Sequence, residues 1–156
     1  MIKRNDCSQG FSLVELIIVI AVMSILGAIS SYSWKQYVDN SSLRAAGRDV
    51  AAEISLYRQK SIGESKTYTM TFDISGNRYI VSNDPGSTAD DIIKSFAAFG
   101  SGIRVVSTTF SGNAFDMQPR GLLDGSGTIN LTNARGSTST VTVNQAGRTH
   151  VEFTMR

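Results

Sequence analysis

The sequence has few of the residues that stabilise or catalyse through covalent or metal chemistry. Among its 156 residues there is one cysteine, Cys7, and one histidine, His150. A single cysteine cannot form an intramolecular disulfide, so stability must come from packing. The usual cysteine and histidine ligand sets for zinc are also missing. We therefore expect no metal site and no cofactor.

Recognisable catalytic motifs are missing as well. There is no Gly-x-Ser-x-Gly elbow, no phosphate loop ending in Gly-Lys-Ser/Thr and no His-Glu-x-x-His helix. Asp90 and Asp91 adjoin, but adjacent carboxylates in a polar loop are more typical of a solvated charge run than of an acid/base pair. We predict that the protein is not an enzyme. Its formal net charge of +2 argues against a strongly basic nucleic-acid binder, although a local patch stays open.

Charge is nearly missing from residues 11–29, where Glu15 is the only charged residue. At about 1.5 Å per residue, a helix of this length crosses most of a ~30 Å hydrocarbon core. Lys3 and Arg4 precede it, which places the N-terminus in the cytoplasm by the positive-inside rule. We predict a single transmembrane helix over residues 11–30.

Placing the Glu15 carboxylate inside a membrane-spanning segment costs free energy. A carboxylate in a spanning segment costs on the order of 2.5–3.5 kcal/mol at the bilayer centre, and less toward an end, so a functional role is the default hypothesis. The alternative is a glutamate that reaches the headgroups from near the helix end.

The residues around Glu15 carry a resemblance. Gly10 to Leu16, Gly-Phe-Ser-Leu-Val-Glu-Leu, is similar to the cleavage and methylation motif of type IV pilins and type II secretion pseudopilins. The resemblance implies that a prepilin peptidase removes the leader, residues 1–10, by cutting after Gly10, and that Phe11 is then methylated. It also implies that Glu15 pairs with the N-terminal amine of a neighbouring subunit during assembly.

Two other kinds of N-terminal signal fit this segment less well. A secretory signal peptide would be cut near Ala28-Ile29-Ser30 and leave Ser31 as the N-terminus, but Glu15 fits its apolar core poorly. A lipoprotein signal would place its cysteine behind the hydrophobic core, whereas Cys7 lies in front of it.

Residues 31–62 predict an amphipathic continuation of the helix. Apolar side chains recur at steps of three or four and form one stripe: Leu43, Ala46, Val50, Ile54 and Tyr57. Four basic residues lie largely off this stripe and read as a solvated face: Arg44, Arg48, Arg58 and Lys60. We expect the helix to end near Ile62-Gly63, because glycine can adopt the left-handed conformation that closes helices.

Beyond residue 63 the hydrophobic period changes to two, and short runs alternate with turn formers. Strands are expected at residues 68–74, 78–82, 92–99, 103–110, 114–117, 128–132, 138–143 and 148–153. The predicted fold is α+β. A long N-terminal helix, membrane-spanning in its first half, packs through residues 43–62 against an antiparallel β-sheet domain of residues 63–156.

Several segments resemble the H-type pseudopilin and FimT minor pilin group: residues 43–50, 115–121, 127–131 and the Gly147-Arg148 pair. The resemblance implies a structural subunit of a type II secretion pseudopilus or a type IV pilus. Its partners would be other pilins, the prepilin peptidase and the bacterial inner membrane, with the C-terminal domain in the periplasm. Which filament it serves stays open.

The alternative function is DNA binding during uptake, which some FimT-like proteins are associated with through basic residues near a Gly-Arg motif. Arg148 and His150 would project from one strand face, with Arg135 in the preceding turn and Arg156 at the terminus. Against this, His150 is mostly neutral near pH 7 and Glu152 would repel phosphate. Arg148 is otherwise a solvated residue that discourages edge pairing.

Overall fold

The computed structural model describes residues 11–83, 91–100 and 102–156, with the side chains of residues 29–33 left out. The predicted leader with Gly10 and Cys7, and Asp90, therefore lie outside the described residues. The chain divides into two compact units, Met1–Tyr37 and Val38–Arg156.

One helix, α1, runs from Leu13 to Glu64 and confirms the predicted long helix. The helix was predicted to end near Ile62-Gly63 with a left-handed glycine; it ends at Glu64, and the prediction that Gly63 closes it was wrong. The left-handed residue is Ser65, with φ 54°, and the Lys66 N–H donates to the Ser61 carbonyl at 3.2 Å to close the last turn. Gly63 lies inside the helix, and the residue with a positive φ is Ser65, two positions later.

In the first unit, every side chain described from Phe11 to Ala28 is exposed. Apolar residues thus surround the whole circumference of this part of α1. Among the residues whose side chains are described, no helix has both the length and the apolar character needed to cross a membrane.

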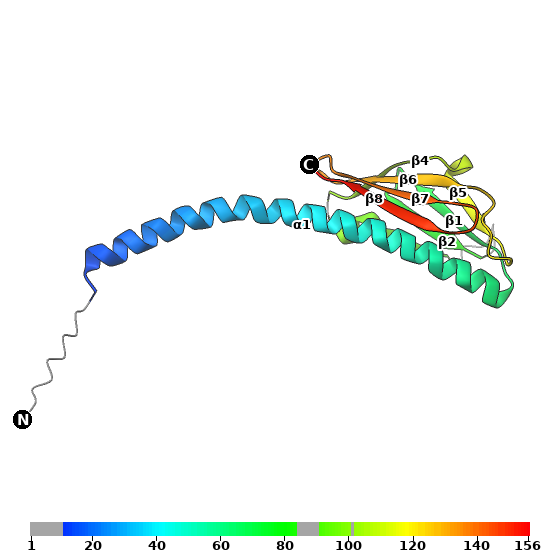
Figure 1. Cartoon of the computed structure of the whole chain (residues 1–156), viewed down its shortest axis with the longest axis horizontal. Helices are drawn as coiled ribbons and strands as arrows, with labels where there is room; N and C mark the ends of the chain where they lie inside the picture. Colours follow the sequence, from blue (N-terminus) through cyan, green and yellow to red (C-terminus); the bar gives the residue numbers. More distant parts are fainter. Residues whose placement is uncertain (1–10, 84–90, 101) are drawn as a thin grey trace, which may run out of the picture. The chain divides into compact units, whose positions relative to one another are not determined.

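The second unit contains two four-stranded antiparallel sheets (Figure 1). The first has the order β3 (Ile92–Ser95), β2 (Arg78–Ser82), β1 (Tyr68–Asp73), β5 (Ala114–Met117). The second has the order β4 (Arg104–Thr108), β6 (Gly127–Thr132), β7 (Thr138–Val143), β8 (Thr149–Thr154). Single-turn 3-10 helices cover Phe96–Phe99 and Ser111–Asn113. The expected antiparallel β domain is confirmed, and its strands divide between two sheets.

The predicted helical stripe is the part of α1 that enters the core. Leu43, Ala46, Val50 and Ile54 are fully buried and Tyr57 nearly so. The aromatic side chains of the first sheet pack beside them, with Phe72 6.1 Å from Tyr79 and 6.4 Å from Phe115 between ring centroids. Burial of apolar area against the helix is the main source of stability for this unit.

Strands β7 and β8 approach α1 closely at Gly47. A Cβ built at Gly47 would overlap Ser139 Oγ and lie 3.3 Å from Val151 Cγ1 and 3.4 Å from Phe153 Cε1. Any larger residue would therefore crowd this contact, which favours glycine here although it weakens a helix interior. Ser139 itself is fully buried, and its hydroxyl has no partner among the described groups.

A polar cluster attaches the β6–β7 turn to α1 near residue 40. Asn133 is 4% exposed and donates from Nδ2 to Asn40 Oδ1 at 3.0 Å. Ser137 donates from Oγ to the same oxygen at 2.9 Å, and Asn133 Oδ1 accepts from the Ser137 N–H at 3.0 Å. Because these buried groups satisfy one another, they fix the turn against the helix.

Candidate functional site

The N-terminal part of α1 forms an apolar surface with one carboxylate. Phe11 is 81% exposed, and the large side chains that follow are between 42% and 73% exposed up to Leu26. Ser24 donates its hydroxyl to the Ile20 carbonyl at 2.7 Å, so its polarity is satisfied inside the helix. A helix that is apolar all round is stable only where other helices or lipid cover it.

Glu15 is the exception on this surface. It lies exposed in the first turn of α1, where the helix dipole favours a negative charge. The Leu16 N–H donates to the Ser12 carbonyl at 3.2 Å, so Glu15 lies within the turn that this first helical hydrogen bond closes. An exposed carboxylate in an apolar surface is able to pair with a cation brought by another molecule.

The four candidate DNA-binding residues separate into two pairs. Arg148 lies just before β8. His150 lies within β8 on its exposed face, with its Nε2 3.4 Å from Glu152 Oε1. Arg135 lies in the β6–β7 turn, where its Nε donates to Asp39 Oδ2 at 3.0 Å. Arg156 Nη1 lies close to the same turn, 3.9 Å from a Cβ built at Gly136.

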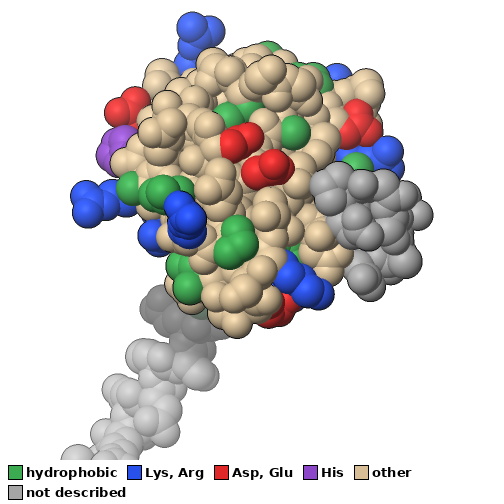
Figure 2. Space-filling view, turned by 90° about the vertical axis from the view of Figure 1, so that its right-hand side faces the viewer, with side chains coloured by type: hydrophobic (Ala, Val, Ile, Leu, Met, Phe, Trp, Pro, Cys, Tyr) green, Lys and Arg blue, Asp and Glu red, His purple; other side chains and the backbone are tan. Residues whose placement is uncertain are grey.

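The two pairs occupy opposite ends of the second sheet. In the β7–β8 register Thr138 faces Thr154 and Val143 faces Thr149. Five residue steps of about 3.3 Å separate these ends, which therefore lie roughly 17 Å apart. Figure 2 shows basic side chains interspersed with acidic ones on the face it presents. DNA binding through these residues stays a prediction, and the structure does not gather them into one basic surface.

Arg58 is a structural residue that the sequence reading placed wrongly on the solvated face. It is half-buried, and its Nε donates to the Gly121 carbonyl at 2.7 Å. Gly147 has a φ of 70°, and a Cβ built there would lie 2.6 Å from Arg58 Nε. Arg58 therefore lies between two segments distant in sequence. Gly147 makes room for its side chain, whereas a Cβ at Gly121 would overlap Ile62.

A charged cluster connects β3 to α1. Lys94 donates to Glu53 and lies 3.8 Å from Asp49, while the buried Tyr79 hydroxyl donates to Asp49 at 2.8 Å. The hydrogen bond to Glu53 raises the pKa of Lys94. Burial, and then the bond to Asp49, raise the pKa of Tyr79. This cluster holds an edge strand in place and presents no free nucleophile or base.

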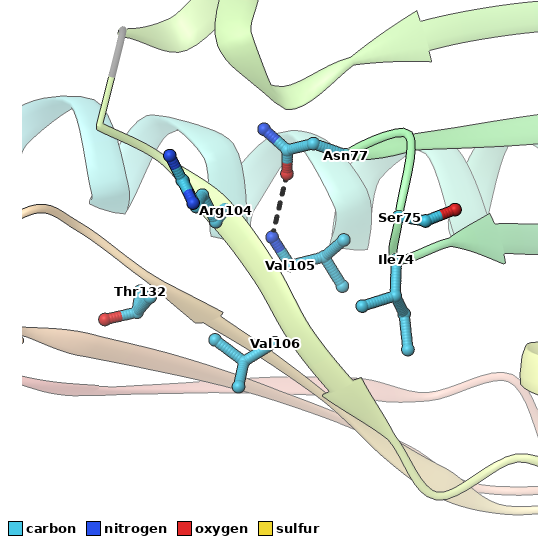
Figure 3. A pocket seen from close by; sticks show the side chains of 7 residues that line it. All are labelled: Ile74, Ser75, Asn77, Arg104, Val105, Val106 and Thr132. Atoms are coloured by element: carbon cyan, nitrogen blue, oxygen red, sulfur yellow. Dashed lines mark hydrogen bonds between the residues drawn. The ribbon is translucent and has the colours of Figure 1, made fainter.

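A groove of about 540 Å³ opens between the β1–β2 turn and β4 (Figure 3). Asn77, at φ 52°, donates from Nδ2 to the Ile103 carbonyl at 2.8 Å and accepts from the Val105 N–H at 3.0 Å. Its amide thus occupies the free edge of β4 as a neighbouring strand would. The groove has no set of groups suited to catalysis; its lining residues are Ile74, Ser75, Asn77, Arg104, Val105, Val106 and Thr132.

Two features define a pilin-like protein. Antiparallel sheets pack on the C-terminal part of one long helix, and the N-terminal part of that helix is apolar and bears one glutamate. The prokaryotic N-terminal methylation motif matches residues 5–31. The chain belongs to the family described as type II transport protein GspH, which matches residues 46–147. It is thus a structural, non-enzymatic protein of the minor pseudopilin class that carries an N-terminal processing motif.

Two solved structures share the fold. The minor pseudopilin EpsH from the type 2 secretion system of Vibrio cholerae has a TM-score of 0.56 and 9% identity, covering 72% of this chain and 97% of its own. The type IV minor pilin FimU of Pseudomonas aeruginosa has a TM-score of 0.56 and 13% identity, covering 74% of this chain and 92% of its own. No curated protein matches the sequence.

Proposed function

We propose that this chain is a minor subunit of a secretion pseudopilus or type IV pilus, anchored in the inner membrane through residues 11–30 before assembly. A prepilin peptidase removes the leader after Gly10, and Phe11 becomes the methylated N-terminus. Subunits then associate through the apolar part of α1. The observation that carries the proposal is the exposed apolar surface of residues 11–28 with its single carboxylate.

Glu15 gives this association its selectivity. In an apolar surrounding a complete charge pair is strong, and one left half-made is costly. A neighbouring subunit that brings its N-terminal amine to Glu15 satisfies both charges. A neighbour in any other register leaves the carboxylate unpaired, so the pair selects one register of assembly.

Processing is tested by replacing Gly10 with leucine in the full chain, expressed with a prepilin peptidase. The bulky side chain should block cleavage and leave the leader attached, as read by mass spectrometry of membrane-extracted protein. A wild-type N-terminus at Ser31 would instead identify an ordinary signal peptide and overturn the proposal.

Assembly is tested with Glu15→Ala, measured as incorporation into sheared filaments. Membrane insertion should be unchanged or easier because an intramembrane charge is removed, while incorporation should fall strongly. Ser24→Ala is the matched control, since its hydroxyl bonds only within the helix. Wild-type incorporation of the Glu15 variant would show that the carboxylate has no role in assembly.

A further inference from the structure

The solvent-facing side of α1 carries a ridge of exposed side chains at intervals of four residues: Arg44, Arg48, Ala52, Leu56 and Lys60. The side chain of Leu56 is 51% exposed, which is high for a leucine in a folded domain. Side chains at i and i+4 form a continuous ridge, and such ridges pack into the grooves of a neighbouring helix. We call these five residues the α1 ridge.

On this half of α1 the acidic side chains have partners within the domain, whereas Arg44 and Arg48 have no acidic partner among the described residues. Its carboxylates are engaged by groups of the same domain: Asp39 with Arg135, Asp49 with Tyr79, Glu53 with Lys94, and Glu64 with Tyr68. Within the described ranges, by contrast, no carboxylate lies at ion-pair distance from Arg44 or Arg48. Like charges at i and i+4 repel by a few tenths of a kcal/mol, so this pair is unfavourable in the isolated domain.

We propose that the α1 ridge docks an acidic helix of a different subunit; this rests on the proposed function, since it requires a neighbouring subunit. Ala52 and Leu56 supply an apolar centre, and the small side chain of Ala52 lets a second helix approach. Arg44 and Arg48 at one end of the ridge match carboxylates spaced one turn apart.

The same features exclude the other occupants. A second copy would bring its own arginines against Arg44 and Arg48, and its helical carboxylates are already engaged. A nucleic acid would lay phosphates against Ala52 and Leu56, which offer them no donor. An acidic amphipathic helix satisfies both the charged and the apolar parts of the ridge.

The test uses the full chain in detergent micelles and a fluorescent helical peptide with glutamates at i and i+4 beside an Ala/Leu centre. A second peptide with lysines in place of the glutamates is the matched probe. The acidic peptide should bind, with an affinity that falls as salt is added, and the lysine peptide should not. The double reversal Arg44→Glu/Arg48→Glu should weaken acidic-peptide binding about tenfold and allow the lysine peptide to bind.

Arg104→Glu/Arg120→Glu makes the same charge change at two exposed arginines elsewhere and should leave binding unchanged. Equal affinity of the Arg44/Arg48 reversal for the acidic peptide would overturn the proposal. So would duplex DNA that displaces the peptide and depends on the same two arginines, because the ridge would then be a phosphate site. The assay involves neither processing nor assembly, so its failure is distinct from a failure of the Gly10 and Glu15 experiments.

Discussion

Replacing Gly47 with alanine tests how closely β7 and β8 pack on α1. In an open helical position this change stabilises by roughly 0.5–1 kcal/mol, because alanine restricts the unfolded chain and favours the helix. At Gly47 the added methyl overlaps Ser139 Oγ and touches Val151 and Phe153. Overpacking of this kind costs about 1–3 kcal/mol. The second effect is larger, so we expect a net destabilisation of about 1–2 kcal/mol.

Two companion variants make the comparison sharp. Gly63→Ala is the control, since a Cβ there meets nothing within 4 Å, and it should not destabilise. Ser139→Ala removes the overlapping oxygen, which is buried without a partner, so it should be neutral or stabilising alone. In the double variant Gly47→Ala/Ser139→Ala most of the lost stability should return.

The measurement is urea unfolding of the full chain in detergent, followed by the near-ultraviolet circular dichroism of the buried tyrosines. These tyrosines report the second unit, whereas the single tryptophan, Trp34, belongs to the first. A Gly47→Ala variant as stable as wild type would refute the close approach. So would a destabilised variant that Ser139→Ala fails to rescue.

Three further perturbations follow from the polar contacts. Arg58→Met should lower stability by about 1–2 kcal/mol, because the Gly121 carbonyl loses a charged donor; urea unfolding measures it. Asn133→Ala should cost about 2–3 kcal/mol in the same assay, since it leaves several groups unpaired in a buried turn. The pKa of Lys94 is raised in the folded protein, so the charged lysine stabilises the fold. This stabilisation is fully present below pH 10.5, the ordinary pKa of lysine, and is lost as the pH rises through the pKa of Lys94 in the folded state. Lys94→Met should therefore weaken the alkaline loss of stability, whereas Lys66→Met should not; an unchanged alkaline profile in Lys94→Met would contradict this.

The buried stripe of α1 could be predicted from sequence because helical periodicity reports burial directly. Leu43 to Tyr57 recur at three and four residues, and all five are buried as expected. The same argument misplaced Arg58, which is off the stripe by periodicity. Its partner Gly121 is 63 residues away, and no local pattern indicates such a contact.

Strands were predictable one by one, but their division into two sheets was not. Alternation of apolar and polar residues shows which face of a strand is buried, and not which strand pairs with it. The pairing of β1 with β5 joins segments some 40 residues apart, and this long-range choice separates the sheets. The left-handed Ser65 was missed because that conformation favours glycine, and here an exposed serine adopts it.

The two attachments of α1 have a mechanical consequence. Asn40 fastens the β6–β7 turn near the start of the part of α1 that belongs to the second unit, and Arg58 fastens the loops before β6 and β8 near the end of the helix. Eighteen residues at about 1.5 Å each place these attachments some 27 Å apart. A pull along the helix therefore loads both at once in shear, and the sheets resist as a block. A helix attached at one end alone would peel away contact by contact under the same load.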